Sequence, residues 1–190
     1  LLVLTGAEQR FHFDGLPPDA QPVPSLLRGF SAPVTLAQDL SESDGMVLLA
    51  HDSDPFNRWE AGQQLCLQAA LTAVRSEAMP ARILSESLVH ALRDVLRHPD
   101  LDAAFKELVL TLPAETYIAE QLDVVDPQRV HAVRETMRAE LAEHLHDDWV
   151  WAYETHHHNG AYHPDPRSSG RRALSGLALS MLCLNARRSG

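Results

Sequence analysis

The hydrophobic and polar positions follow two different periods along the chain. In residues 1–37, apolar side chains alternate with polar ones, as Phe11 and Phe13 do with His12 and Asp14. An interval of two is typical of a strand with one buried face. Several prolines interrupt the region and favour sheet edges and loops, because proline cannot donate a ladder hydrogen bond. Three or four short strands are too few for a sandwich, so residues 1–37 are predicted to be the tail of a β-sandwich domain.

From about Ser41 onward the apolar positions recur every three or four residues, which predicts helices. Asp54-Pro55 and Asp126-Pro127 are expected to be helix starts. Aspartate accepts the free N–H groups of a first turn, and proline at the first position lacks the donor that would be left over. The first predicted helices are 41–50, 54–78, one carrying Leu84 to Leu96, one carrying Leu101, Phe105, Leu108 and Leu112, and a shorter one ending at Leu122. The longest predicted helix has an apolar stripe from Val130 to Trp149, with Arg134, Glu135, Arg138 and Glu143 facing out. The last predicted helix carries Leu174 to Leu184.

Short connections make neighbouring helices antiparallel, and paired antiparallel helices in series often stack into a superhelical array. The predicted fold is therefore mainly α, a helical-repeat-like antiparallel array preceded by a short β remnant. A compact orthogonal bundle is the alternative that the pattern leaves open. Residues 38–190 are predicted to be the first part of a C-terminal helical domain. The start "LLVLT", without a Met, is read as the inside of a longer protein.

The composition of the chain narrows the classes of partner that it is expected to bind. The chain has 190 residues and a formal net charge of −10, which argues against nucleic acid as the main partner. No stretch reaches about 18 consecutive apolar residues, so no membrane partner is expected. Cys66 and Cys183 lie in apolar helical patterns and are predicted to be buried free thiols in a reducing compartment.

The richest metal-like cluster lies in the loop from His156 to His163 and consists of His156, His157, His158 and His163. Adjacent histidines on a loop cannot all reach one ion without strain, and no cysteine or spaced carboxylate completes the set. The loop is interpreted as solvated, with metal binding as the alternative. His144 and His146 are two residues apart on a predicted helix and do not face each other, so they are assigned to the surface.

Other polar clusters have plain interpretations. Asp123 and Asp126 lie between helices and are read as caps and turn formers rather than an acid/base pair. Trp149 and Trp151 are expected to divide, with one in the core and the other at an interface. Three arginines, Arg167, Arg171 and Arg172, open the last helix. They are expected to form surface ion pairs, although an acidic groove or a peptide terminus would also suit them.

The stretch "HDSDPFNRWEAGQQL", residues 51–65, resembles a binding site because it concentrates aromatic and charged side chains. It is interpreted as a helix start. Phe56 and Trp59 are three residues apart on one face and are expected to bury against neighbouring helices. Arg58 is expected to pair with an acid or a loop carbonyl.

Catalytic motifs are absent from the chain. The sequence contains no H-E-x-x-H, no G-x-S-x-G, no phosphate-binding loop and no dinucleotide fingerprint. No catalytic residue and no metal ligand is therefore assigned, and the substrate-binding residues are left unknown.

Four stretches in order resemble the zinc aminopeptidase N family of the bacterial alanyl aminopeptidase type. They are "PVPSLLRGFSAPVTL", "HDSDPFNRWEAGQQL", "LTLPAETYIAEQLDVVDPQRVHAVRE" and "GRRALSGLALSMLCL". The resemblance implies a four-domain parent with a thermolysin-like catalytic domain, zinc held by H-E-x-x-H and a downstream Glu, and a G-x-M-E-N motif for the substrate N-terminus. Neither motif occurs here, so no zinc or catalytic residue carries over.

The resemblance thus implies a cytoplasmic zinc aminopeptidase, of which this chain is the non-catalytic C-terminal portion covering the active site. Its expected partners are the parent's catalytic domain and peptides entering the covered cleft. The fragment itself is expected to be inactive and to hold no cofactor. A free-standing helical-repeat protein-interaction module is the alternative function.

Overall fold

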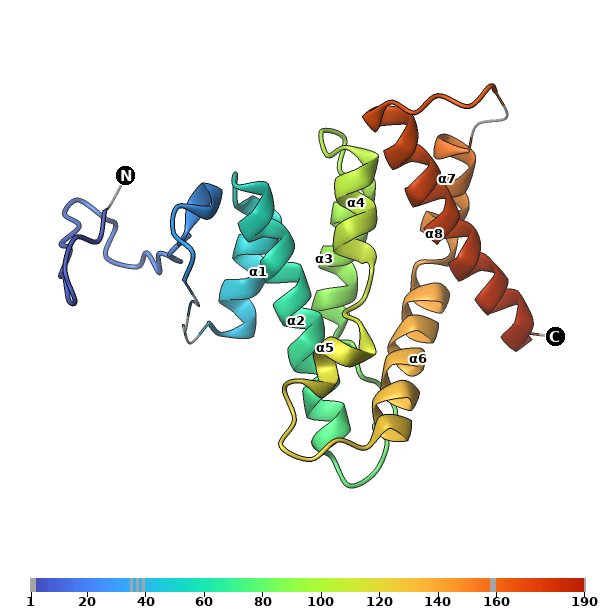
Figure 1. Ribbon diagram of the computed structural model, residues 1–190, viewed down its shortest axis with the longest axis horizontal. Helices are drawn as coiled ribbons and strands as arrows, with labels where there is room; N and C mark the ends of the chain where they lie inside the picture. The colour runs from blue at the N-terminus through green and yellow to red at the C-terminus, as the bar shows by residue number, and fades with distance from the viewer. Residues whose placement is uncertain (1–2, 35, 37, 39, 158–159, 190) are drawn as a thin grey trace.

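The protein is a row of helices, seen in a computed structural model that describes residues 3–34, 36, 38, 40–157 and 160–189. The elements are a 3₁₀ turn η1 Arg28–Phe30 and the helices α1 Glu42–His51, α2 Pro55–Arg75, α3 Glu86–Arg97, α4 Ala103–Leu110, α5 Glu115–Ala119, α6 Pro127–His144, α7 His146–His156 and α8 Pro166–Ser189. The longer helices alternate in direction from α1 to α6, α7 continues in the direction of α6, and α8 runs back at the other end of the row (Figure 1). The predicted antiparallel helical array is confirmed.

The helix starts follow the predicted capping chemistry. Asp54 accepts hydrogen bonds from the backbone N–H groups of Phe56 and Asn57, and Pro55 follows it. Asp126 does the same at the start of α6. Ser41 caps α1 and forms a reciprocal capping box with Asp44. These starts are local, which is why the sequence predicts them well.

The end of α2 differs from the prediction. The helix stops at Arg75 rather than Ala78, and a side chain from α6 donates to carbonyl groups at and just beyond its end. One terminal nitrogen of Arg129 lies 2.9 Å from the carbonyl oxygen of Ala73 and 3.0 Å from those of Ser76 and Ala78. A guanidinium at this place satisfies carbonyls that have no partner within the helix.

The predicted longest helix is two helices. The chain leaves helical geometry at Leu145, where φ is −109° and ψ is 23°, so α6 and α7 are separate and α8, with 24 residues, is the longer helix. Arg93 on α3 donates to the carbonyl oxygen of His144 at the break, over 2.9 Å. The stripe itself holds across the break, since Met137, Leu141 and Trp149 are all buried.

The core lies between the long helices. Its largest fully buried side chains include Trp149, Leu84, Leu92, Leu96, Leu141 and Leu174. The predicted stripe of α4 is wrong at Leu108, which is 54% exposed, while Val109 and Leu110 are buried. Of the four side chains predicted to face out on α6, Glu143 is exposed and the other three are half-buried.

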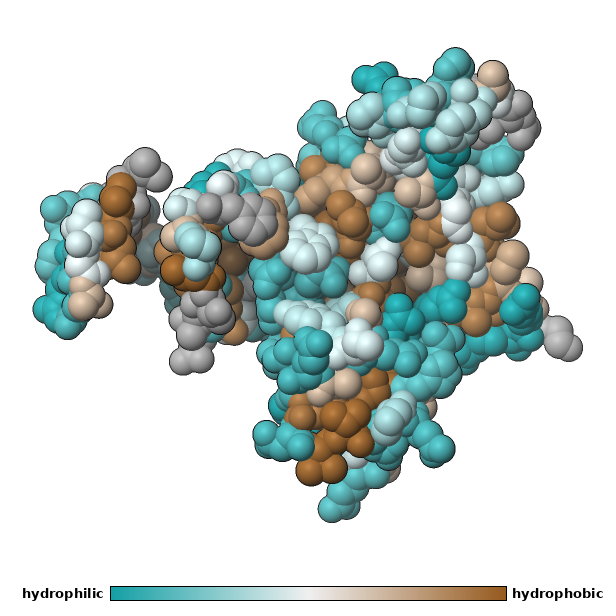
Figure 2. Space-filling model, viewed as in Figure 1, coloured by the Kyte–Doolittle hydropathy of each residue, from teal (hydrophilic) through white to brown (hydrophobic). Residues whose placement is uncertain are grey.

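The strands predicted in the N-terminal region do not form in the described residues 3–34, 36 and 38. This part is extended chain with turns, lying apart from most of the array (Figure 1), and it keeps apolar side chains on its surface (Figure 2), with Val3, Leu4 and Phe13 59–66% exposed. A strand needs a neighbour for its ladder hydrogen bonds, and this segment pairs with none of the described residues. The predicted turn at Arg28-Gly29 does occur, as η1.

Candidate functional site

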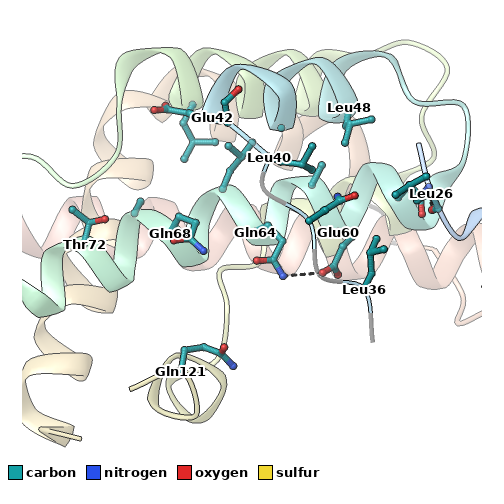
Figure 3. Close-up of a pocket in the computed structure, with 18 of the residues that line it drawn as sticks. Leu26, Leu36, Leu40, Glu42, Leu48, Glu60, Gln64, Gln68, Thr72 and Gln121 are labelled. Carbon is teal, nitrogen blue, oxygen red and sulfur yellow. Dashed lines mark hydrogen bonds between the residues drawn. The ribbon is translucent and has the colours of Figure 1, made fainter. Parts of the chain in front are cut away.

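A groove lies between the described residues of the stretch 24–40, which leave out 35, 37 and 39, and the helices α1 and α2, and we call it the junction groove. Its volume is about 1390 Å³. Apolar side chains, among them Leu26, Leu36, Leu40 and Leu48, line one part of it (Figure 3). Glu60, Gln64, Gln68 and Thr72 line another, at intervals of four along α2, with Gln121 across from them (Figure 3). Residues four apart share a helix face, so α2 presents a polar ladder to the groove.

The chemistry of the groove suits binding. Gln64 donates to the carboxylate of Glu60 over 2.8 Å, and the amides beyond it can both donate and accept. Among its described lining residues there is no histidine, cysteine or aspartate. Side chains of this kind match the donors and acceptors of a polypeptide backbone.

A set of hydrogen bonds fastens the N-terminal segment to the corner between α1 and α2, and we call it the polar latch. Arg28 reaches Asp52 and Ser53, each at 2.7 Å. The backbone N–H of Gly29 donates to Asp54 over 2.9 Å, and Asn57 donates to the carbonyl oxygen of Leu26 over 2.7 Å. The latch holds the chain through a left-handed turn, in which Leu27 has a φ of 52° and Gly29 one of 64°.

Asp52 is the charged centre of the latch, with its side chain 1% exposed. Burial raises the pKa of Asp52. Hydrogen bonds from Ser25, from the N–H of Asp54 and from Arg28, together with the charge of Arg28, lower it, and the net pKa lies below the ordinary 3.8. Asp52 is therefore ionised at neutral pH and pairs with Arg28. The sequence reading missed this pair, because its members are 24 residues apart and lie in segments of different character.

The aromatic start of α2 takes the structural role that was predicted. The ring centroids of Phe56 and Trp59 are 5.6 Å apart, although both residues are half-buried rather than buried. Arg58 donates to the carbonyl oxygens of Leu49 and Ala50, over 2.6 and 3.0 Å. Arg58 therefore satisfies carbonyl groups at the end of α1. Of its two predicted partners, an acid or a carbonyl, the carbonyl is confirmed.

The histidine loop is more divided than predicted. His156 ends α7 and is half-buried, His157 follows it, His163 is exposed, and His158 lies outside the described residues. Within the part of the chain that the structure describes, no three His, Cys, Asp or Glu side chains come together in a way that could hold a metal ion. His144 and His146 are exposed, as predicted, and flank the break at Leu145.

The other polar predictions have mixed outcomes. Asp126 caps α6, and Asp123 is an exposed turn residue. Among the described residues no carboxylate lies within ion-pair distance of Arg167, Arg171 or Arg172, the arginines that open α8, so their predicted ion pairs are wrong. Arg171 donates to the carbonyl oxygen of Thr155 and Arg172 to that of His163. Arg167 is exposed.

The tryptophans Trp149 and Trp151 differ in burial, and so do the two cysteines. Trp149 is fully buried and donates to the carbonyl oxygen of Leu141, which confirms one tryptophan in the core, and Trp151 is half-buried beneath Arg97. Both thiols are free, but only Cys66 is buried and Cys183 is exposed. Burial raises the pKa of the Cys66 thiol to about 12, so this thiol is unreactive at neutral pH.

A helical-repeat array joined to a short non-helical segment is the class that this geometry defines. Comparison with family models gives the same division. Residues 42–190 match the family described as a domain of unknown function (DUF3458_C) with ARM repeats, and residues 1–39 match the family described as a domain of unknown function (DUF3458) with an Ig-like fold. The chain belongs to the DUF3458_C family.

Curated relatives identify the longer proteins in which such a region occurs. The chain is 38% identical over 174 residues to aminopeptidase N of Caulobacter vibrioides and 34% identical over 183 residues to that of Haemophilus influenzae, covering 92% and 96% of this chain. It spans about one fifth of the length of those relatives. The chain therefore corresponds to a C-terminal region of aminopeptidase N-type proteins.

A solved structure supports the fold. Aminopeptidase A of Legionella pneumophila, crystallised in complex with aspartic acid, superposes with a TM-score of 0.76 at 24% identity, over 90% of this chain and 20% of that one. No helix in the described part of this chain combines the length and apolar character needed to cross a membrane.

Proposed function

We propose that this chain is the non-catalytic C-terminal portion of a cytoplasmic zinc aminopeptidase that removes N-terminal residues from peptides. In this proposal residues 1–37 are the tail of a β-sandwich domain and residues 38–190 are the first part of the helical domain. The observation that carries it is the continuous similarity to aminopeptidase N over more than nine tenths of the chain. The described residues do not offer a zinc-ligand set, so zinc is assigned to the parent's catalytic domain.

The proposed role of the array is to cover the catalytic cleft, so that only peptides with accessible N-termini enter and water is excluded. The polar latch supports this role, because it fixes the first helices of the array relative to the segment that precedes them. A cover must be held in a defined orientation, and hydrogen bonds between charged partners are the stronger ones.

Two measurements test the proposal. The purified chain, given an aminoacyl chromogenic substrate and zinc, is expected to show no turnover, and clear turnover would disprove its inactivity. In the full-length parent, Arg28→Ala is expected to leave kcat/KM for the small chromogenic substrate unchanged and to raise it for a large, partly folded substrate. Arg172→Ala, on the far side of the array, is the matched control. Equal behaviour of the two variants toward large substrates would count against the covering role.

A free-standing interaction module is the second candidate, and the junction groove with its polar ladder favours it. The two candidates differ in their partner. A cover binds the parent's remaining domains when these are mixed with the purified chain, whereas an independent module does not. Surface plasmon resonance between the two purified parts distinguishes them.

A further inference from the structure

A second polar cluster, remote from the junction groove, lies where α4, α7 and α8 meet. Helices α4 and α8 approach closely here, since a Cβ atom on Gly170 would lie 2.8 Å from the backbone nitrogen of Ala104. Two residues beyond Ala104, Lys106 is only 4% exposed. Lysine is almost never this buried unless its ammonium group is paired or reaches the surface at the end of a buried stem.

Lys106 has no such partner among the described residues. Its ammonium group lies 5.7 Å from the ring centroid of Trp151, and no described acceptor is within hydrogen-bond distance. Burial lowers the pKa of Lys106, and the charge of Asp102 opposes that shift. Asp102 is exposed and caps α4 through the N–H of Phe105, so it leaves the ammonium without a direct hydrogen bond.

Two nitrogen groups near Lys106 are buried without a hydrogen-bond partner, and they belong to His156 and Arg171. His156 stands edge-on to Trp151, with ring centroids 6.0 Å apart, and its Nε2 is buried without a hydrogen-bond partner. The Nε of Arg171 is buried and unpartnered as well, although the guanidinium reaches Thr155 through a terminal nitrogen. Burial lowers the pKa of His156, and the charges of Lys106 and Arg171 lower it further, which places all three groups in one electrostatic neighbourhood.

The neighbouring carboxylates are already used. Asp148 on α7 accepts from Arg93 and Arg97 of α3, over 2.9 and 2.7 Å, and Arg97 stacks on Trp151 at 4.3 Å. The connected groups thus include four cations and only two carboxylates, within a chain whose net charge is −10. Buried polar groups such as the Nε2 of His156 and the Nε of Arg171 are normally hydrogen-bonded, and an excess of positive charge around them favours an anion.

We propose that Lys106, His156 and Arg171 form a binding pocket for one small oxyanion, with Trp151 as its apolar wall. A carboxylate or a similar oxyanion has several acceptor sites and no donor, so it can take one N–H from each of the three groups. Its charge offsets those of Lys106 and Arg171. The oxyanion comes either from free solute or from an acidic side chain of another polypeptide segment. This assignment does not depend on the aminopeptidase role.

The experiment uses the purified chain with three probes at constant ionic strength: acetate, sulfate and a blocked tripeptide with glutamate at its centre. The imidazole resonances of His156 are followed by NMR, with sodium chloride as the reference salt. Saturable shifts with acetate or sulfate, and a pKa of His156 that rises on binding, support the pocket. The rise is expected because the anion favours the imidazolium and screens it from Lys106 and Arg171. Binding of the tripeptide in addition shows that a side chain can be the source.

Variants separate the pocket from general surface charge. Lys106→Met is expected to weaken acetate binding about tenfold, the loss of one charge-assisted hydrogen bond. Arg172→Met removes the same charge from the exposed neighbour of Arg171 and should change the affinity little. His156→Gln keeps a donor at that position and serves if Lys106→Met does not fold. It should still bind the probes, with Trp151 fluorescence as the readout. Responses to acetate and sulfate no larger than that to chloride, or equal losses in both methionine variants, would overturn the proposal.

Discussion

The N-terminal segment and the helical array are built from similarly apolar sequence, yet only one of them forms regular structure within this chain. A helix satisfies its backbone internally, so α2 and α8 form wherever one apolar stripe can be buried. A strand takes its hydrogen bonds from a neighbour, and the alternation around Phe11 and Phe13 finds none among the described residues. A helical period in the sequence therefore predicts a helix by itself. An alternating period predicts only a segment that needs a neighbouring strand to form one. The polar latch is where the two regions meet.

The largest expected effect separates the interior of the array from its edge. Trp149→Ala should lower the free energy of unfolding by about 3–5 kcal/mol, because the ring is fully buried and bonded to Leu141. Trp59→Ala, near the latch, should cost less, about 1–3 kcal/mol, because Trp59 is half-buried. Urea unfolding followed by circular dichroism measures both. Equal losses would show that the boundary packs as firmly as the core.

The next effect tests how closely the array itself is packed. Gly170→Ala places a methyl group against the backbone of Ala104 and should cost about 1–3 kcal/mol. Gly176→Ala, on the same helix, meets nothing within 4 Å and should stabilise by up to about 1 kcal/mol through its helix propensity. Thermal melts of the two variants should move in opposite directions. A shared direction would contradict the close approach of α4 and α8.

A smaller effect is confined to the latch. Arg28→Ala should change the global free energy of unfolding by only about 1 kcal/mol, since the guanidinium is partly exposed. It should nevertheless speed amide exchange at Gly29, whose N–H is held by Asp54. Exchange in the middle of α6 is the internal control. Unchanged exchange at Gly29 would mean that the latch does not hold the segment.

The smallest effect is a pH dependence of the same latch. The pKa of Asp52 is lowered on folding, so its contribution is fully present above the ordinary value of 3.8 and is lost as the pH falls through the lowered value. Exchange at Gly29, corrected for its intrinsic pH dependence, should therefore rise in acid. Asp52→Asn should show the raised exchange already at neutral pH, without the acid step. An acid step that persists in Asp52→Asn would assign it to another group.

The sequence predicts best what is decided locally. The starts of α2 and α6 depend on Asp-Pro pairs that act on the next two or three N–H groups, and both occur as expected. The ends are decided elsewhere. Arg129 donates to the end of α2, and Arg93 donates to His144 at the break after α6, and no local pattern contains either contact.

The candidate sites follow the same rule. Arg58 was recognisable because the carbonyls that it satisfies lie eight and nine residues away. The Arg28–Asp52 pair and the burial of Lys106 were not, because each needs two distant segments to meet. The only signal for Lys106 was a lysine inside the apolar run "AAFKELVL". A charged residue at such a position indicates either a snorkelling side chain or a buried partner, and only the packing of α4 against α8 tells which.

The hydrogen bonds from Arg129 to the end of α2 bear on how helical arrays of this kind can be engineered. In an ideal solenoid each repeat contacts only its neighbours and can be added or removed as a unit. Here the carbonyl groups at the end of an early helix are satisfied by a residue more than fifty positions downstream. Removing α6, or grafting α2 alone into another array, would leave the carbonyl groups at the end of α2 without the guanidinium that donates to them. The natural unit for transplantation is therefore α2 through α6 together.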